Sequence, residues 1–361
     1  MNAQPIRLLV VDDSALARKI ITDSLAPFPE IEVVGTATDP YVARDKILAL
    51  KPDVVTMDIE MPRMDGITFL KLIMKHRPMP VIVLSSLSTE GSHKALEALQ
   101  AGAVDVIGKP GSAYSAHTDG SRLAEKIIAA AGARVQAGPV APAPKAEIRP
   151  IAPRQGAVRR QPLSSQQIIL LGASTGGTEA LKTVLTSLRG DLPGICIVQH
   201  IPAYFSRAFA ERLNKECPME VREAAHGDLV TPGLALIAPG GRHMILKERN
   251  AGYAVELSDG PPVHHQKPSV DIMFDSAVKA GAGPHAVAAL LTGMGSDGAA
   301  GLLRLREAGA ITAAQNEETC VVFGMPREAI KLGAARHILP LSQIGVFLEQ
   351  QNSVQLEETY V

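Results

Sequence analysis

The serine best placed to act as a nucleophile is Ser174, in the stretch Gly-Ala-Ser-Thr-Gly-Gly at residues 172–177. The apolar run 168–171 before it predicts a buried parallel strand, and residues 178–188 have the pattern of a helix. The serine therefore lies where a strand turns into a helix, whose first N–H groups could stabilise an oxyanion. The stretch lacks the lysine of a Walker loop and differs from the hydrolase elbow pattern, so a phosphate-binding glycine loop or a plain tight turn also explains it.

Two further polar residues follow predicted strands in the second half of the chain. His200 comes directly after the short apolar run 195–199, and Asp297 follows the apolar run 287–292 within a glycine-rich turn. Because the carboxyl ends of parallel strands meet at one edge of a sheet, we expect both side chains to lie near Ser174. The three residues would then serve as nucleophile, general base and orienting anion.

Other residues could take the roles of base and anion, although none follows a strand in the same way. The alternatives are His226, His243, His264, His265, His285 and His337 as bases and Asp228, Asp271 and Asp275 as acids. Asp271 and Asp275 have i, i+4 spacing in a predicted helix at 269–279, where Asp271 could serve the helix N-terminus. Cys196 lies within the strand before His200 and is expected to pack in the core rather than to attack a substrate.

A second group of reactive residues lies in the first half of the chain, again at the ends of predicted strands. The group consists of Asp12, Asp13, Asp58, Ser85, Lys109 and Pro110. Three carboxylates in one pocket would repel one another unless a divalent cation neutralised them, and such oxygen ligands suit Mg²⁺. Asp58 could then attack a phosphoryl group, with Lys109 balancing charge and Ser85 hydrogen-bonding the product.

The elements that must position these residues alternate regularly along the chain. In the first half we expect strands at 8–11, 31–37, 54–57, 81–85 and 105–107 and helices at 15–25, 41–50, 66–75, 93–101 and 120–130. This order predicts a parallel sheet covered on both faces. Strands and helices alternate again in the second half, with helices at 203–214 and 299–308, and short strands at 234–238, 244–247 and 253–257 predict a hairpin region.

The 361 residues are enough for two ordinary domains joined by a linker. We expect the first domain at 5–133 and the second at 167–349, because residues 134–166 are rich in proline, alanine and basic residues with little apolar periodicity. That segment is interpreted as a flexible, solvated linker. An acidic tail, 350–361, is expected to be disordered.

Composition excludes several classes of protein. A hydrophobic content of 46% is that of a globular protein, and a net charge of −1 gives no electrostatic reason to expect nucleic acid or an anionic membrane as a partner. The cysteines, Cys196, Cys217 and Cys320, are odd in number and unevenly spaced, which supports neither a disulfide framework nor a zinc site. The start lacks a signal-peptide pattern and no segment offers ~18 apolar residues for a membrane span, so we expect a cytoplasmic protein.

The acidic and basic residues of the first half resemble those of the receiver domain of two-component response regulators, over about residues 5–133. The resemblance implies a flavodoxin-like fold with a doubly wound, five-stranded parallel sheet. It also implies phosphorylation of Asp58 by a histidine kinase, with Ser85 and Lys109 acting in the switch.

The same resemblance implies a ligand set for the metal. Mg²⁺ would be held by Asp13, Asp58 and the main-chain carbonyl of Glu60, with Asp12 supporting it through water. Val106 occupies the position where many receivers carry a switching aromatic residue. The output signal is therefore expected to travel through surface contact between the domains rather than through an aromatic ring.

The whole chain resembles the CheB family of chemotaxis response-regulator methylesterases. The resemblance rests on the receiver, the linker and three stretches in order, at residues 172–177, 199–202 and 291–299. It implies a Rossmann-like second domain with a largely parallel sheet, and hydrolysis of glutamyl methyl esters on chemoreceptors, with deamidation of specific receptor glutamines as a further activity. It implies no cofactor in that domain.

The resemblance also assigns roles to individual residues. It gives the catalytic roles to Ser174, His200 and Asp297, and it points to the main-chain N–H of Met294, with Thr175 nearby, as oxyanion donors. We expect the unphosphorylated receiver to obstruct the Ser174 edge and phosphorylation to open it.

Two other functions compete with this interpretation. A serine esterase acting on small esters or amides fits the same three residues, and a noncatalytic docking protein would tolerate replacement of Ser174. A DNA-binding response regulator is disfavoured, because the second half offers neither a basic recognition helix nor a helix-turn-helix pattern.

Overall fold

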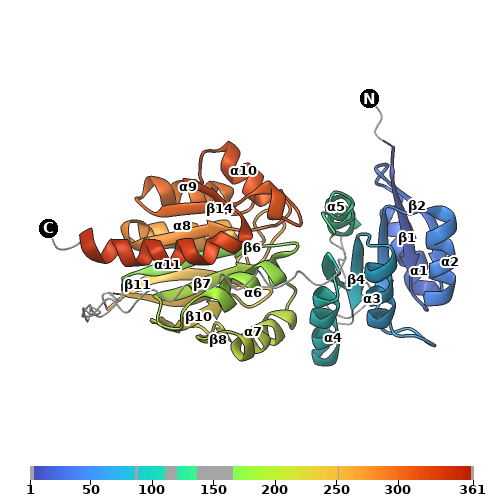
Figure 1. The fold of residues 1–361 in the computed structure, drawn as a ribbon, viewed down its shortest axis with the longest axis horizontal. Helices are drawn as coiled ribbons and strands as arrows, with labels where there is room; N and C mark the ends of the chain where they lie inside the picture. The colour runs from blue at the N-terminus through green and yellow to red at the C-terminus, as the bar shows by residue number, and fades with distance from the viewer. Residues whose placement is uncertain (1–3, 86–87, 110–119, 136–165, 251, 359–361) are drawn as a thin grey trace, which may run out of the picture.

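The computed structural model describes residues 4–85, 88–109, 120–135, 166–250 and 252–358. Two α/β bodies lie side by side, the N-terminal one in blue to green-blue and the C-terminal one in green to red (Figure 1). Pro110, residues 136–165 of the predicted linker and the end of the predicted tail lie outside the described residues. The boundaries of the two domains and of the linker stay predictions.

The N-terminal body is a five-stranded parallel sheet with helices on both faces. Its strands pair in the order β2-β1-β3-β4-β5. The strands are β1 (Ile6–Val11), β2 (Ile31–Ala37), β3 (Val54–Asp58), β4 (Val81–Ser85) and β5 (Asp105–Gly108), and the helices are α1 (Ala15–Leu25), α2 (Pro40–Leu50), α3 (Gly66–His76), α4 (Thr89–Gln100) and α5 (Gly120–Ala131). This order and sheet confirm the predicted flavodoxin-like fold.

The C-terminal body is built on a seven-stranded sheet in which every pair is parallel. The order is β15-β14-β13-β6-β7-β10-β8. Its strands are β6 (Ile168–Ala173), β7 (Gly194–Gln199), β8 (Glu220–Glu223), β10 (Leu234–Ile237), β13 (Ala286–Leu290), β14 (Ile311–Gln315) and β15 (His337–Leu339). The prediction of a largely parallel sheet is confirmed.

Both faces of the larger sheet are covered. One face packs against α6 (Gly177–Ser187), α7 (Phe205–Glu216) and α11 (Leu341–Glu358). The other packs against α8 (Val270–Lys279), α9 (Ala299–Glu307) and α10 (Met325–Lys331), together with a three-stranded sheet of β9 (Leu229–Val230), β11 (His243–Arg249) and β12 (Gly252–Ser258). Strands β11 and β12 form the predicted antiparallel hairpin.

Some element boundaries differ from the prediction for identifiable reasons. Helix α4 begins at Thr89, a turn before the predicted start at 93, because Ser88 caps it by accepting a hydrogen bond from Gly91 N. Strand β13 ends at Leu290 rather than at 292, because its last residues turn into the glycine-rich loop. Strands β8, β9, β14 and β15 and helices α10 and α11 were not predicted. Helix α11 includes residues 350–358, so the prediction of a disordered tail is wrong over these residues.

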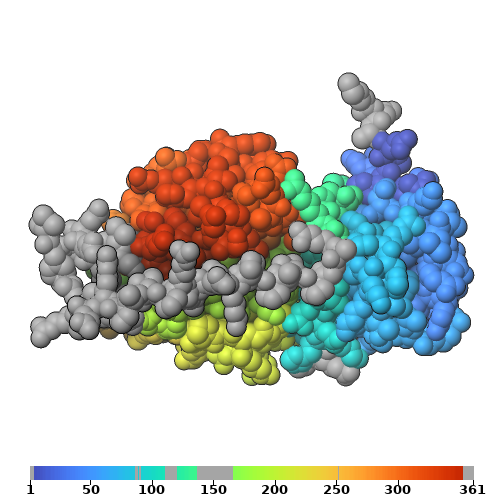
Figure 2. Space-filling model, viewed as in Figure 1, coloured from blue at the N-terminus to red at the C-terminus, as the bar shows by residue number. Residues whose placement is uncertain are grey.

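The two bodies pack through helices α4 and α5 of the first, where α4 contacts α7 and α6 of the second. The space-filling view shows the green-blue residues of α5 against the orange and red surface (Figure 2). Buried apolar side chains of α4 and α7, including Leu99 and Phe205, line one common cavity across the junction. Among the described helices, none is both long and apolar enough to cross a membrane.

Candidate functional site

Ser174 lies directly after β6, on a turn that its neighbours hold tightly. Ser174 N donates to Thr292 O at 3.0 Å, and Gly177 N donates to Ser174 O at 2.7 Å. Gly176 has a φ of 77°, and a Cβ there would lie 2.6 Å from Val321 Cβ, so only glycine fits this position without strain. The serine is thus presented at the carboxyl edge of the sheet, just ahead of α6, as the sequence predicted.

His200 and Asp297, which lie far apart in sequence, are joined by a hydrogen bond. His200 Nε2 is 2.8 Å from Asp297 Oδ2, and both side chains are buried. Because a carboxylate only accepts, Nε2 carries the proton, and a neutral ring then leaves Nδ1 as the acceptor. Within the described residues, this buried Nδ1 has no hydrogen-bond partner. The geometry therefore leaves Nδ1 as the nitrogen able to take a proton.

The carboxylate of Asp297 is held at the N-terminus of α8. Oδ2 accepts from Val270 N at 2.7 Å, while Oδ1 accepts from Ser269 Oγ at 2.8 Å and from Asp271 N at 3.1 Å. Burial alone would raise the pKa of Asp297, but the hydrogen bond and charge interaction with His200, aided by these donors, hold it below its ordinary value. Asp297 is therefore set up as a fixed anion that orients the histidine ring.

Gln199, the last residue of β7, is a site residue that sequence reasoning did not single out. Its buried Nε2 donates to Ser174 O at 2.8 Å and to His200 O at 3.3 Å. One side chain thus ties the backbone of the predicted nucleophile to that of the predicted base. The sequence signals were its position next to His200 and its place in the stretch 199–202, and neither assigned a role to its side chain.

The predicted oxyanion donors are Thr175, which directly follows Ser174, and the main-chain N–H of Met294, which follows Gly293. Gly293 packs so closely that a Cβ there would be 2.6 Å from Ser174 Cβ, which brings the Gly293–Met294 peptide to the serine. Thr175 is buried, and its hydroxyl donates to Asp105 Oδ2 of the N-terminal body at 2.7 Å. The same oxygen of Asp105 pairs with Lys126 on α5, whose pKa burial lowers.

The N-terminal body also closes the space above Ser174 and His200. The cavity that remains there measures about 20 Å³ and is lined from the N-terminal side by Leu99, Val104, Asp105 and Val106. A volume of this size holds about one water molecule. Val106, at the position of the expected switching residue, is thus a buried part of this contact.

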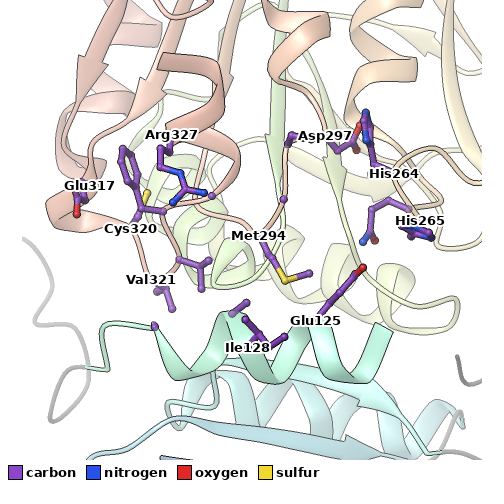
Figure 3. A pocket seen from close by; sticks show the side chains of 18 of the residues that line it. Glu125, Ile128, His264, His265, Met294, Asp297, Glu317, Cys320, Val321 and Arg327 are labelled. Atoms are coloured by element: carbon purple, nitrogen blue, oxygen red, sulfur yellow. The ribbon is translucent and has the colours of Figure 1, made fainter. Parts of the chain in front are cut away.

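A far larger cavity, about 810 Å³, lies beside this closed site (Figure 3). Glu125 and Ile128 on α5 face it from below, and Met294 reaches toward Ile128 from the opposite wall. Its lining includes Asp297 but neither Ser174 nor His200. The open space in this arrangement therefore does not lead onto the serine.

Two of the alternative bases and acids from the sequence, His264 and Asp271, lie beside Asp297, and His265 lines the large cavity that Asp297 borders. His285 ends a short 3-10 helix before β13. His243 is bonded to Ser269 N and Pro261 O, His226 accepts from Leu257 N, and His337 packs on Phe347. Asp228 pairs with Arg222 and Asp275 with Arg304, whereas Asp271 lies beside Asp297 and faces His264. Burial raises the pKa of the Cys196 thiol to about 12, which makes it a poor nucleophile.

The acidic residues of the first half come together as predicted from their strand ends. Oxygen atoms of Asp12, Asp13 and Asp58 all lie within 4.8 Å of one another. Lys109 Nζ is 2.6 Å from Asp58 Oδ2 and 3.4 Å from Asp12 Oδ2, and Glu60 N donates to Asp58 Oδ1. Ser85 is buried at the end of the neighbouring strand, where its hydroxyl donates to Gly91 O.

The electrostatics of this cluster favour a cation. Burial raises the pKa of Asp58, and the charge of Asp12 adds to the rise, although Lys109 acts in the opposite direction. Burial would lower the pKa of Lys109, but its bonds to Asp58 and Asp12 raise it. Three clustered carboxylate groups supply the hard oxygen ligands that Mg²⁺ prefers, so the residues fit that ion.

Comparisons with known proteins agree with this architecture. Residues 169–348 match the family model described as CheB methylesterase, and residues 8–117 match the response regulator receiver domain. The chain is 54% identical to protein-glutamate methylesterase/protein-glutamine glutaminase 2 of Syntrophus aciditrophicus, over 94% of this chain and 97% of that protein. The chain is also 52% identical to protein-glutamate methylesterase/protein-glutamine glutaminase 4 of Anaeromyxobacter dehalogenans, over 94% of this chain and 93% of that protein.

A solved structure matches the C-terminal body. The Thermotoga maritima CheB methylesterase catalytic domain is 35% identical, with a TM-score of 0.50, and the match covers 51% of this chain and 98% of that one. Both predicted domains are therefore represented by known relatives, and the full-length relatives carry them together. This chain belongs to the CheB methylesterase family.

Proposed function

We propose that this protein is a phosphorylation-regulated protein-glutamate methylesterase that hydrolyses glutamyl methyl esters on chemoreceptors during chemotaxis adaptation, and that it also deamidates specific receptor glutamines. The observation that carries the proposal is the pairing of His200 with Asp297 at the strand edge that presents Ser174. The names of the relatives, which are about half identical over nearly the whole chain, support protein glutamyl methyl esters as the substrate class and both activities.

The first half of the reaction is an acyl transfer. Ser174 Oγ bonds to the ester carbonyl carbon while its proton passes to His200 Nδ1, which is free to accept it. The C–O bond to the methoxy group then breaks, the same proton goes to the leaving oxygen, and methanol departs. For a glutamine, ammonia would leave in place of methanol.

The second half returns the enzyme to its starting state. Water attacks the acyl carbon as His200 takes its proton, the bond to Ser174 Oγ breaks, and His200 returns the proton to that oxygen. The free glutamate acid then ionises, which leaves a new negative charge on the receptor. Asp297 stabilises the imidazolium in both halves. The N–H of Met294 and the hydroxyl of Thr175 would hold the oxyanion, and a donor of this kind typically contributes roughly 3–4 kcal/mol.

The receiver supplies the regulation in this proposal. Asp12, Asp13 and Asp58, with the main-chain carbonyl of Glu60, would hold Mg²⁺, which neutralises charge on the transferred phosphoryl group when it is bound. Asp58 accepts the phosphoryl group from a chemotaxis histidine kinase, while Lys109 balances the charge on its oxygens.

The closed arrangement supports inhibition by the receiver. A cavity of about 20 Å³ at Ser174 has no room for a glutamyl ester side chain, and the Thr175 hydroxyl is already engaged by Asp105. Phosphorylation of Asp58 would shift the equilibrium toward an arrangement in which this edge is open. The inhibition is then chemical as well as steric, because one oxyanion donor is occupied.

The test measures methanol release from methylated chemoreceptor membranes, with and without acetyl phosphate and Mg²⁺. Wild type should release methanol and be stimulated, Ser174→Ala should lose roughly 10⁴-fold or more of the rate, and Asp58→Ala should not respond to the phosphodonor. Asp45→Asn, on the outer helix α2 with only an exposed partner, serves as the control. No methanol from wild type under any condition would remove the assigned substrate and favour an esterase for small esters or a docking role.

A further inference from the structure

Asp271 is a buried carboxylate that the proposed mechanism does not use. It is the second residue of α8, and its Oδ1 accepts a hydrogen bond of 2.6 Å from Gly301 N in the first turn of α9. Gly298 N contributes a second backbone interaction. A Cβ at residue 301 would lie 2.8 Å from Oδ1, so the glycine permits this close approach.

Asp271 and Asp297 hold each other's helices in a reciprocal arrangement. Asp297, one residue ahead of the N-cap of α9, accepts from Val270 N and Asp271 N at the start of α8. Asp271, at the start of α8, accepts from Gly301 N near the start of α9. The N-terminus of each helix therefore binds a carboxylate from the segment that begins the other helix, which couples the positions of the two carboxylates.

The charged groups around Asp271 partly balance it. His264 Nε2 lies 3.2 Å from its Oδ2, Arg304 Nη2 lies 3.9 Å from its Oδ1, and the like charge of Asp297 is adjacent. His264 and Asp297 face each other at the edge of the large cavity in Figure 3. Burial, and then the charge of Asp297, raise the pKa of Asp271. Asp271 is therefore a buried carboxylate that lies beside a second one, Asp297, which orients the proposed base.

We propose that Asp271 is a positioning residue of the esterase. It fixes the turn at residues 298–301 and thereby sets the distance between the carboxylate of Asp297 and the ring of His200. The inference rests on the proposed Ser174, His200 and Asp297 mechanism. Asp271 touches neither substrate nor the reacting atoms. Its contribution comes from the fixed distance of 2.8 Å between Asp297 Oδ2 and His200 Nε2 and from the negative potential that it adds beside that pair.

The test uses full-length protein with acetyl phosphate and Mg²⁺, assayed on methylated receptor membranes and on p-nitrophenyl acetate. Asp271→Ala removes the acceptor, so kcat should fall roughly tenfold to a hundredfold while KM changes less than about twofold. Asp271→Asn keeps an acceptor for Gly301 N and should recover most of kcat. Asp228→Asn is the matched control, because Asp228 also accepts a backbone N–H at 2.6 Å, from Ala225, and lies in an ion pair elsewhere.

A pH profile separates positioning from mere stability. Asp271→Asn removes the carboxylate that lies beside Asp297, so the acid limb of kcat/KM should move by at least a few tenths of a pH unit. The inference is overturned if Asp271→Ala keeps kcat within twofold. It is also overturned if the loss equals the loss of folded protein and the acid limb of Asp271→Asn does not move.

A parallel variant distinguishes failure of this inference from failure of the proposed mechanism. If Asp297→Asn keeps the wild-type rate, the assignment of the three catalytic residues fails, and the positioning role fails with it. If Asp297→Asn loses the rate while Asp271→Ala does not, only the positioning role is wrong. Thermal melting of each variant reports the folded fraction that both comparisons require.

Discussion

The contact between Asp105 and Thr175 predicts a measurable effect on basal activity. The Thr175 hydroxyl donates to Asp105 Oδ2 at 2.7 Å, and the Asp105 side chain is only 14% exposed. A hydrogen bond to a charged group contributes roughly 1.5–3 kcal/mol, and one between neutral groups roughly 0.5–1.5 kcal/mol. Asp105→Asn should therefore weaken the closed arrangement by about 1 kcal/mol, while still offering Lys126 an amide oxygen.

A change of about 1 kcal/mol corresponds to roughly a fivefold change in an equilibrium constant. If the unphosphorylated protein is mostly closed, Asp105→Asn should raise its basal methanol release up to about fivefold. The fully phosphorylated rate should stay the same, because the open form no longer makes this contact. The ratio of the phosphorylated rate to the basal rate should therefore fall. The assay measures methanol release from receptor membranes with and without acetyl phosphate.

Two control variants show whether the change in basal release is specific to Asp105. Thr175→Ser keeps the hydroxyl and should behave like wild type, whereas Asp45→Asn on α2 removes an exposed receiver carboxylate and should change neither rate. The reasoning is refuted if Asp105→Asn leaves basal release unchanged while Asp58 still accepts phosphate at the normal rate. An equal rise in both rates would also refute it, since Asp105 would then act on the chemistry rather than on the equilibrium.

Three further predictions concern Mg²⁺ binding by the receiver, the hydrogen bonds that Gln199 donates, and the pH dependence of stability. Mg²⁺ at ten times its dissociation constant should stabilise the receiver by about 1.4 kcal/mol in thermal melts, and Asp13→Asn should abolish the shift. Gln199→Met removes the side-chain donor to the carbonyl of Ser174, which keeps the N–H of Gly177, so urea unfolding should show a loss of roughly 0.5–1.5 kcal/mol together with lower esterase activity. The pKa of Asp297 lies below its ordinary 3.8, so its ionised form adds stability above that pH. Asp297→Asn should therefore be less stable than wild type at neutral pH, and the difference should shrink as the pH falls below about 4 in urea titrations.

The fold and most of the site were predictable because the signals are local. Apolar runs such as 168–171 and 287–292 form buried parallel strands, and this places polar residues at one edge of the sheet. The His200 to Asp297 contact and the carboxylate cluster around Asp58 follow from that rule. The glycine-rich turn of Ser174 was ambiguous by itself and gained meaning only from its neighbours.

The remainder could not be predicted because it depends on contacts between distant surfaces. Thr175 and Asp105 are separated by 70 positions in the sequence, and nothing local to either residue indicates that they meet. Gln199 has an ordinary amide whose role exists only once two backbones converge on it. Asp271 lies in the first turn of its own helix, where the sequence allowed it to serve the N-terminus, but its carboxylate also accepts from the start of a different helix, which no local pattern indicates.

The position of Asp105 at the start of β5 connects the Ser174 site with the Asp58 site, so each site can influence the other. Lys109, bonded to Asp58, directly follows the same short strand that begins with Asp105. In a two-state scheme the coupling between two sites is reciprocal, so whatever favours the open form from one end must also favour it from the other. A receptor segment that binds at Ser174 would displace Asp105 and thereby make Asp58 easier to phosphorylate. Substrate would then act as an effector of the receiver, and the enzyme would be activated most readily where its substrate is already bound.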